Sequence, residues 1–194
     1  STQLDATYEQ LNAALGFKTS PVTGLWFNIY GGYQDLKNNL ASAAIANYSG
    51  SYLQLLQGNM HNIYAGAEAS YSYKDIISFT ASGIYRDWKT AKTENNSGDQ
   101  LLYYMPSFEA NFKVDIRPVS SVLINLGYQH ITREKIGNER VDPVGNLYLG
   151  GSYEVFEGIS IYVRANNLLN KDYQYYPGYP TEGINFMGGV SFRF

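Results

Sequence analysis

The stretch that decides the fold is Gly183-Ile184-Asn185-Phe186-Met187-Gly188-Gly189-Val190-Ser191-Phe192-Arg193-Phe194. Its residues alternate between an apolar set (Ile184, Phe186, Gly188, Val190, Phe192, Phe194) and a mostly polar set (Asn185, Met187, Gly189, Ser191, Arg193). Because successive side chains of a strand point to opposite faces, this pattern predicts a strand with one apolar and one polar face. Terminal residues of soluble domains are usually polar and poorly ordered, so we expect Phe194 to be tied into a sheet.

The same alternation recurs along the chain and predicts about nine strands. The segments are 8–19, 25–34, 63–73, 77–86, 108–117, 122–129, 147–155, 159–166 and 183–194. Short connections (20–24, 74–75, 118–120, 157–158) alternate with long ones (36–58, 90–100, 133–145, 169–182). All tight turns then lie at one end of the sheet, which indicates an all-β, antiparallel, up-and-down architecture.

Composition narrows the class of protein. The 194 residues carry a net charge of −3, which gives no reason to expect nucleic acid as a partner. There is no Cys, so disulfides and Cys-based zinc sites are excluded. Charged residues make up only 16%, below the roughly 25% of soluble domains. No apolar run reaches the ~20 residues of a membrane helix, and the first residues do not form a signal peptide.

Alternation alone does not say whether the apolar face is a soluble core or faces lipid. Aromatic residues near the strand ends are typical of the girdles of membrane barrels. The polar face carries charges of both signs that could pair across a lumen: Glu109, Lys113, Asp115, Arg164 and Arg193. We therefore expect a transmembrane β-barrel in the bacterial outer membrane, with lipid as a partner. A soluble β-sandwich or barrel is the alternative.

The carboxy-terminal part resembles the end of a TonB-dependent outer-membrane receptor. Three elements carry the resemblance: the Asn-Leu motif in Val163-Arg164-Ala165-Asn166-Asn167-Leu168, the element Gly178-Tyr179-Pro180, and the closing Phe192-Arg193-Phe194. In that family an Arg often opens the last strand, whereas Gly183-Ile184-Asn185 stands here. The motifs cover 163–194; upstream of them, only strand rhythm and loop asymmetry agree.

The resemblance implies a barrel of about 22 strands with a plug domain inside it. Such receptors import scarce ligands (iron chelates, haem, cobalamin, glycans) with energy passed on by TonB. Phe194 would be part of the signal that the barrel-assembly machinery reads. We expect residues 1–194 to form a barrel segment without the plug, the rest of the barrel and the plug lying elsewhere in the same chain or in another. A tenth strand within 40–56 would instead give a self-contained small barrel.

The candidate ligand-binding residues are the aromatic residues of the loop-side rim. Tyr173, Tyr175, Tyr176 and Tyr179 combine a flat stacking face with a hydrogen-bonding tip, and Trp88, Tyr103 and Tyr104 belong to the same rim. The alternative is an interfacial girdle or loop packing. His61 and His130 stand on different segments without metal-site spacing, so we expect no metal and no cofactor.

Three functions remain open at this level. The first is ligand uptake through a TonB-dependent receptor. The second is a complete small outer-membrane barrel with a structural or narrow-pore role, and the third is a soluble barrel that binds a ligand. No phosphate loop or nucleophile elbow is present, so we expect no enzyme.

Overall fold

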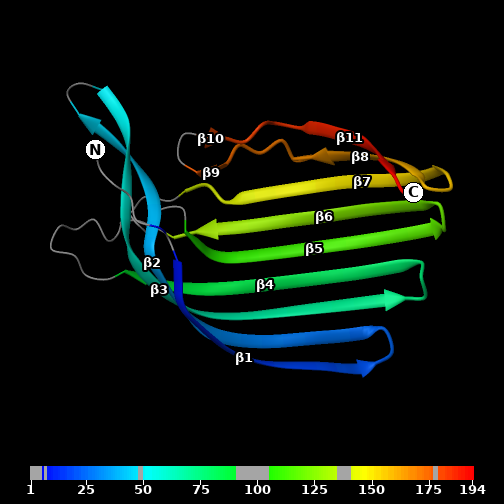
Figure 1. Cartoon of the computed structure of the whole chain (residues 1–194), viewed down its shortest axis with the longest axis horizontal. Helices are drawn as coiled ribbons and strands as arrows, with labels where there is room; N and C mark the ends of the chain where they lie inside the picture. The colour runs from blue at the N-terminus through cyan, green and yellow to red at the C-terminus, as the bar shows by residue number, and fades with distance from the viewer. Residues whose placement is uncertain (1–5, 7, 48–49, 91–104, 135–140, 177–178) are drawn as a thin grey trace.

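The computed structural model describes residues 6, 8–47, 50–90, 105–134, 141–176 and 179–194. All secondary-structure elements in these ranges are β-strands, and Figure 1 shows how the strands are arranged. The strands are β1 (Tyr8–Val22), β2 (Leu25–Asn47), β3 (Gly50–Tyr73), β4 (Ile77–Thr90), β5 (Pro106–Val119), β6 (Val122–Arg133), β7 (Val144–Phe156), β8 (Ile159–Asn166), β9 (Gln174–Tyr176), β10 (Tyr179–Pro180) and β11 (Asn185–Phe192). The described residues include no helix long and apolar enough to cross a membrane.

Nine strands form one sheet in the order β1-β2-β3-β4-β5-β6-β7-β8-β11, and each neighbouring pair is antiparallel. The short turns lie together at one end, on the right in Figure 1. The predicted all-β, up-and-down architecture is therefore confirmed. The described sheet is not closed, because β1 and β11 each have a neighbour on one side only.

Residues that tolerate a left-handed backbone make the short turns. Gly24 and Gly158 have φ angles of 85° and 83°, which a side chain would strain. Each glycine carbonyl also accepts a backbone hydrogen bond from the next strand over: Ser72 N to Gly24 O (2.8 Å) and Arg193 N to Gly158 O (2.7 Å). The turns thus fix the register of a third strand as well as their own hairpin.

The prediction of a long connection over 36–58 was wrong. These residues extend β2 and β3 into a hairpin that pairs from Leu25↔Tyr71 to Asn47↔Gly50, with one irregularity between Leu36 and Asn39. Residues 40–47 and 50–56 are therefore strand, but they lengthen two predicted strands and add no tenth strand to the described sheet. Beyond the irregularity the hairpin bends away from the other strands, at the left of Figure 1. The small pair β9 and β10 likewise lies within the predicted loop 169–182.

One face of the nine-stranded sheet is apolar and exposed. Leu15 is 85% exposed and Val163 is 63% exposed, although both sit in mid-strand. Exposed apolar side chains of the same face recur on the other strands, for example Ile29, Ile63, Phe79, Phe112, Leu126, Leu149, Ile161 and Val190. Exposed apolar area of this extent marks contact with a partner or lipid. We call this surface the outward face and the opposite, polar surface the lumen face.

The outward face stops being apolar at a defined level on the loop side. Asp35 pairs with Lys37 (3.4 Å) and Asp87 with Lys89 (3.7 Å), one step beyond Tyr33 and Tyr85. On β4 the apolar positions run from Ile77 to Tyr85. At ~3.3 Å per residue this is about 26 Å of strand, or about 20 Å of height at a tilt near 40°. This height approaches the ~25 Å apolar band of outer-membrane barrels.

Candidate functional site

A hydrogen-bonded network crosses the lumen face of β1 to β4 near the loop side. Arg86 Nη1 donates to Gln34 Oε1 (3.2 Å) and to Asn62 Oδ1 (2.8 Å). Asn62 Nδ2 donates to the same Gln34 oxygen (3.0 Å), and Gln34 Nε2 donates to Glu9 Oε2 (2.6 Å). Because Asn62 is fully buried, this network holds the Arg86 guanidinium in a fixed position.

Tyrosine rings cover glycines of neighbouring strands on the lumen face. A Cβ on Gly32 would lie 2.6 Å from the Tyr64 ring, and a Cβ on Gly66 would lie 2.5 Å from the Tyr30 ring. The Tyr64 hydroxyl donates to Asn12 Oδ1 (2.8 Å), and its ring contacts Tyr30 edge to face. The rings therefore lie along the wall instead of filling the lumen, which only a residue without a side chain permits.

A similar arrangement occurs on β6, β7 and β8. The Tyr148 ring covers Gly127, and Arg164 stacks on Tyr148 with its Cζ 4.0 Å from the ring centroid. Arg164 Nε donates to Asn166 Oδ1 (2.7 Å), and Asn166 Nδ2 donates to Asn185 Oδ1 (3.3 Å). A glycine, a tyrosine and an arginine thus form a layered unit in each half of the sheet.

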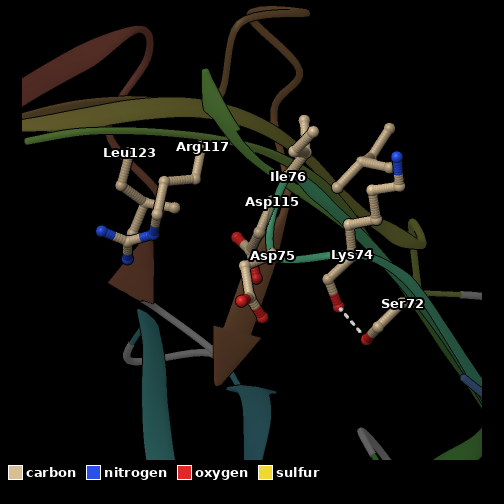
Figure 2. A pocket seen from close by; sticks show the side chains of 9 residues that line it. Ser72, Lys74, Asp75, Ile76, Asp115, Arg117 and Leu123 are labelled. Carbon is tan, nitrogen blue, oxygen red and sulfur yellow. Dashed lines mark hydrogen bonds between the residues drawn. The ribbon is translucent and has the colours of Figure 1, made fainter. Parts of the chain in front are cut away.

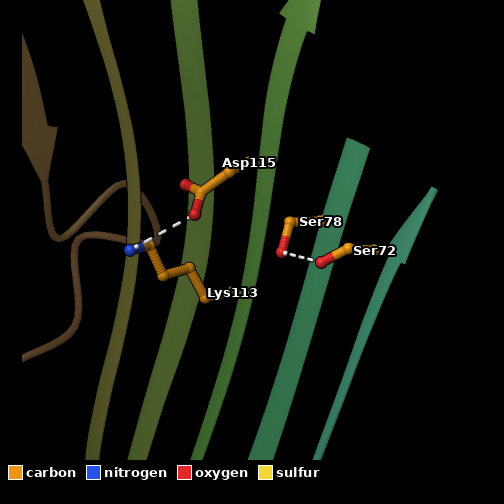
Figure 3. Close-up of polar contacts among 4 residues, drawn as sticks. All are labelled: Ser72, Ser78, Lys113 and Asp115. Carbon is orange, nitrogen blue, oxygen red and sulfur yellow. Dashed lines mark hydrogen bonds and ion pairs between the residues drawn. The ribbon is translucent and has the colours of Figure 1, made fainter. Parts of the chain in front are cut away.

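The structure places the predicted lumen charges as follows. Lys113 and Asp115 form an ion pair of 3.3 Å (Figure 3). Glu109 lies on the same strand in register with Ile84 and Ile131, and Arg164 belongs to the layered unit above. Arg193 is exposed at the turn side, beside Gly158. Sequence alternation predicts a shared lumen face for these residues, which stays a prediction, and it could not give their partners.

A cavity of about 310 Å³ lies at the turn side of the lumen face, between β3, β4, β5 and β6. Figure 2 shows Asp75 and Asp115 near one another in it, with Arg117 and Lys74 on either side. Ser72 and Ser78 also line it, and their hydroxyl oxygens lie 3.4 Å apart (Figure 3). Asp115 Oδ1 is buried and has no hydrogen-bond partner among the described residues, while Oδ2 carries the ion pair to Lys113.

Two of the predicted rim aromatics, Tyr173 and Trp88, are buried. Tyr173 is 4% exposed and packs against Ile131 and Val144. Trp88 is 6% exposed, packs on Met60 and donates from Nε1 to Pro106 O (2.7 Å). Both rings therefore support the loop-side ends of the strands. Tyr176 and Tyr179 pair across β9 and β10, and Tyr175 lies within β9; Tyr103 and Tyr104 lie outside the described residues. Ligand binding by the predicted aromatic set stays a prediction.

Two residues that sequence reasoning missed organise the segment after β8. Asn167 is 1% exposed with φ 51°, and its Nδ2 donates to Lys171 O and Glu182 O (both 3.0 Å). Its own backbone N–H donates to Asn146 Oδ1 (2.8 Å). Arg133 is 6% exposed and donates to Gln174 O (2.5 Å). An Asn directly after a strand was the available signal, since Asn tolerates the left-handed region.

The two histidines lie on the outward face at the loop side. His61 contacts the Tyr33 ring, and His130 lies near Tyr128 and Phe108 and hydrogen-bonds Thr132 Oγ1 (2.9 Å). In the ranges that the structure describes, no group of three or more His, Cys, Asp or Glu side chains could hold a metal ion.

Comparison with solved structures finds similar folds at low sequence identity. The copper transporter OprC superposes with a TM-score of 0.68 at 18% identity, over 94% of this chain and 31% of that one. The siderophore receptor PirA from Acinetobacter baumannii gives 0.66 at 14% identity, over 94% and 31%. The ferric enterobactin receptor PfeA from Pseudomonas aeruginosa gives 0.64 at 16% identity, over 98% and 32%. No family model matches the sequence, and no curated protein matches it.

These neighbours bear out the predicted class of barrel. Their names are those of transporters and receptors, and the chain spans about a third of the length of each. Nearly all of this chain takes part in each superposition, so the nine-stranded sheet corresponds to part of a larger barrel wall. The chain has the fold of a segment of an outer-membrane receptor barrel, as its resemblance to TonB-dependent receptors implies.

Proposed function

We propose that this chain forms part of the barrel wall of a TonB-dependent receptor that imports a scarce ligand across the bacterial outer membrane. The observation that carries the proposal is the open sheet itself, with an exposed apolar outward face and a hydrogen-bonded lumen face. Its similarity to a copper transporter and to siderophore receptors favours a metal ion or a metal chelate as the cargo. Haem, cobalamin and glycans are the other ligands that the resemblance implies.

The direction of the strands supports a partial barrel. Eight antiparallel pairings connect β1 to β11, so these two edge strands run in the same direction. Direct pairing of β1 with β11 would be parallel, whereas bacterial single-chain barrels are antiparallel and even-numbered. An odd number of further strands must therefore stand between β11 and β1. An unpaired sheet edge cannot remain in lipid, because its N–H and C=O groups would have no partners.

The proposed partners follow from this arrangement. Lipid covers the outward face, the remaining strands pair with β1 and β11, and a plug domain occupies the lumen and connects the receptor to TonB. Phe194 lies just beyond β11 and its side chain is exposed, so the expectation that it is tied into the sheet was wrong; its role as the assembly signal stays a proposal. A self-contained small barrel is the second candidate, and the odd strand count disfavours it. The exposed apolar face disfavours a soluble ligand-binding barrel.

The test combines location with growth. Source cells are fractionated and probed with an antibody against this chain, and a strain without the gene is grown with chelated copper or a ferric siderophore as the limiting metal source. We expect an outer-membrane band, slow growth of the deletion strain, and rescue both by the gene and by excess unchelated metal. A band in the soluble fraction would overturn the location and with it the transport proposal.

A further inference from the structure

Among the described residues, the Arg86 guanidinium donates hydrogen bonds through one of its three nitrogen atoms. Nη1 donates both hydrogen bonds, to Gln34 and Asn62. Nε and Nη2 have no hydrogen-bond partner among the described residues, and neither is one of the buried atoms that lack a partner. These two atoms form the side edge of the guanidinium, which matches the two oxygens of a carboxylate or phosphate.

The positive charge of Arg86 is not neutralised by a contacting carboxylate. Both of its acceptors are neutral amide oxygens, and no carboxylate of the described residues lies within ion-pair distance. In contrast, Lys37, Lys89 and Lys113 each contact an aspartate. An arginine whose hydrogen-bond acceptors are neutral keeps more of its attraction for an anion than one that is paired with a carboxylate.

The position of Arg86 is set by the layer beneath it. Its Cζ lies 4.8 Å from the centroid of the Tyr64 ring, and that ring covers Gly32. Gly32, Tyr64 and Arg86 are consecutive partners in one row across β2, β3 and β4. Stacking and two hydrogen bonds therefore fix the guanidinium before a ligand arrives, which lowers the entropy that binding costs.

We propose that Arg86 is an oxyanion-binding residue of the lumen, and that its Nε–Nη2 edge receives a carboxylate, catecholate or phosphate group of a small anionic ligand. Arg164, stacked on Tyr148 with Nε bound to Asn166 Oδ1, presents its Nη1 and Nη2 atoms and acts as a second contact for the same class of ligand. The proposal rests on the proposed function in one respect, namely that ligands pass the lumen face. It adds the charge class of the ligand and the residue that reads it.

The test measures binding of sodium citrate, as a carboxylate probe, to the complete detergent-purified protein by isothermal titration calorimetry. Sucrose is the uncharged control. We expect citrate to bind the wild type, and we expect this binding to weaken with added NaCl, whereas sucrose should give no heat of binding. Arg86→Gln should weaken citrate binding at least about tenfold, because it removes a charge-assisted bidentate contact. Arg86→Lys keeps the charge and loses the planar edge, so its citrate affinity should lie between those of the wild type and Arg86→Gln.

Lys89→Gln is the matched control. Lys89 lies on the same strand as Arg86 but on its opposite, outward face, and it is paired with Asp87. This variant should leave citrate affinity within about twofold. The heat-dependent shift of the folded barrel in gel electrophoresis shows that each variant is folded. Unchanged affinity in folded Arg86→Gln, or in folded Arg86→Lys if the glutamine variant does not fold, would overturn the proposal. A wild type that binds no citrate would overturn it as well.

The binding test and the growth test fail independently. Suppose that citrate binding depends on Arg86 but that deletion of the gene does not slow growth on chelated metal. The oxyanion site then stands, and the uptake role is rejected. A growth defect that the Arg86→Gln gene rescues as well as the wild type, together with unchanged citrate affinity, keeps uptake and rejects the oxyanion site.

Discussion

The Tyr64 ring lies between Gly32 on one neighbouring strand and Arg86 on the other. A Cβ on Gly32 would come within 2.6 Å of the ring, and the guanidinium lies 4.8 Å from its centroid on the side of β4. The missing side chain of Gly32 therefore determines where the arginine sits, two strands away. Gly32 therefore helps to position the charged group of Arg86, in addition to the usual role of glycine in allowing strands to bend.

Gly32→Ala should therefore destabilise the barrel by about 1–3 kcal/mol, because the added methyl meets both the Tyr64 ring and Ala13 O (2.5 Å). Gly83→Ala is the matched control, since a Cβ there has its nearest neighbour at 3.7 Å on the outward face. Urea unfolding in detergent compares the two variants with the wild type. Equal stability of the Gly32 and Gly83 variants would contradict this reading of the layered unit.

Strand rhythm was sufficient to predict most of the fold. Period-two alternation with lipid on one side is a strong signal, and it located all nine strands and the tight turns of the sheet. It failed over 36–58, where Ala41-Ser42-Ala43-Ala44 and neighbouring small or polar residues do not alternate clearly. There the two strands are specified by pairing with each other, from Asn39↔Gly58 to Asn47↔Gly50, which no single strand shows by its own pattern.

The face assignment predicts opposite outcomes for two lysine substitutions on β8. Val163 is on the outward face, so Val163→Lys places a charge in lipid and should cost about 2–4 kcal/mol near the membrane midplane. Ser160 is on the lumen face in register with Glu154, so Ser160→Lys should change stability by less than about 0.5 kcal/mol. Folding of the purified protein into lipid vesicles measures both, and comparable losses would refute the assignment of faces.

Trp88 should act as an anchor of the loop-side rim. Trp88→Phe removes the Nε1–H bond to Pro106 O and leaves that carbonyl without this donor, at an expected cost of about 1–3 kcal/mol. Trp26→Phe is the control, because the Lys18 ammonium lies over the Trp26 ring at 4.6 Å and a Phe ring keeps an aromatic face for it, so the expected loss is below about 1 kcal/mol. The heating midpoint of the folded gel band ranks the variants, and a larger loss for Trp26→Phe would contradict the anchoring role.

Glu134, just after β6, should make the loop-side rim sensitive to pH. Burial raises the pKa of Glu134 above its ordinary value of 4.5, nearby Asp87 raises it further, and a hydrogen bond from the Trp88 backbone and the charge of Lys89 oppose the rise. A raised folded-state pKa gives a stability contribution that is complete below the ordinary value and is lost as pH rises through the raised value. Glu134→Gln should therefore match the wild type near pH 4 and exceed its thermal midpoint at pH 8. A gap independent of pH would argue against this assignment.

The candidate site was harder to predict than the fold. Alternation predicts that Glu109, Lys113 and Arg164 share one face, because facing depends only on position along a strand. That this face lines a lumen stays a prediction. The contacts of Arg86 depend on register across β2, β3 and β4, which the sequence does not display. Tyr173 shows the same limit, since a tyrosine in a loop carries the same local signal whether it is buried or exposed.

Tyr173 and Tyr175, a packing residue and a predicted ligand-binding residue, should respond differently to truncation. Tyr173→Ala removes a buried ring from its contact with Ile131 and Val144, at an expected cost of about 3–5 kcal/mol, and should expose 167–182 to protease. Tyr175→Ala, in the candidate ligand-binding set, should leave the protease pattern unchanged and weaken ligand capture. Limited proteolysis of intact cells reads the first effect, and growth on chelated metal reads the second. If Tyr173→Ala cells keep a protected loop but lose growth, the buried tyrosine acts in binding, and the packing explanation for its position is wrong.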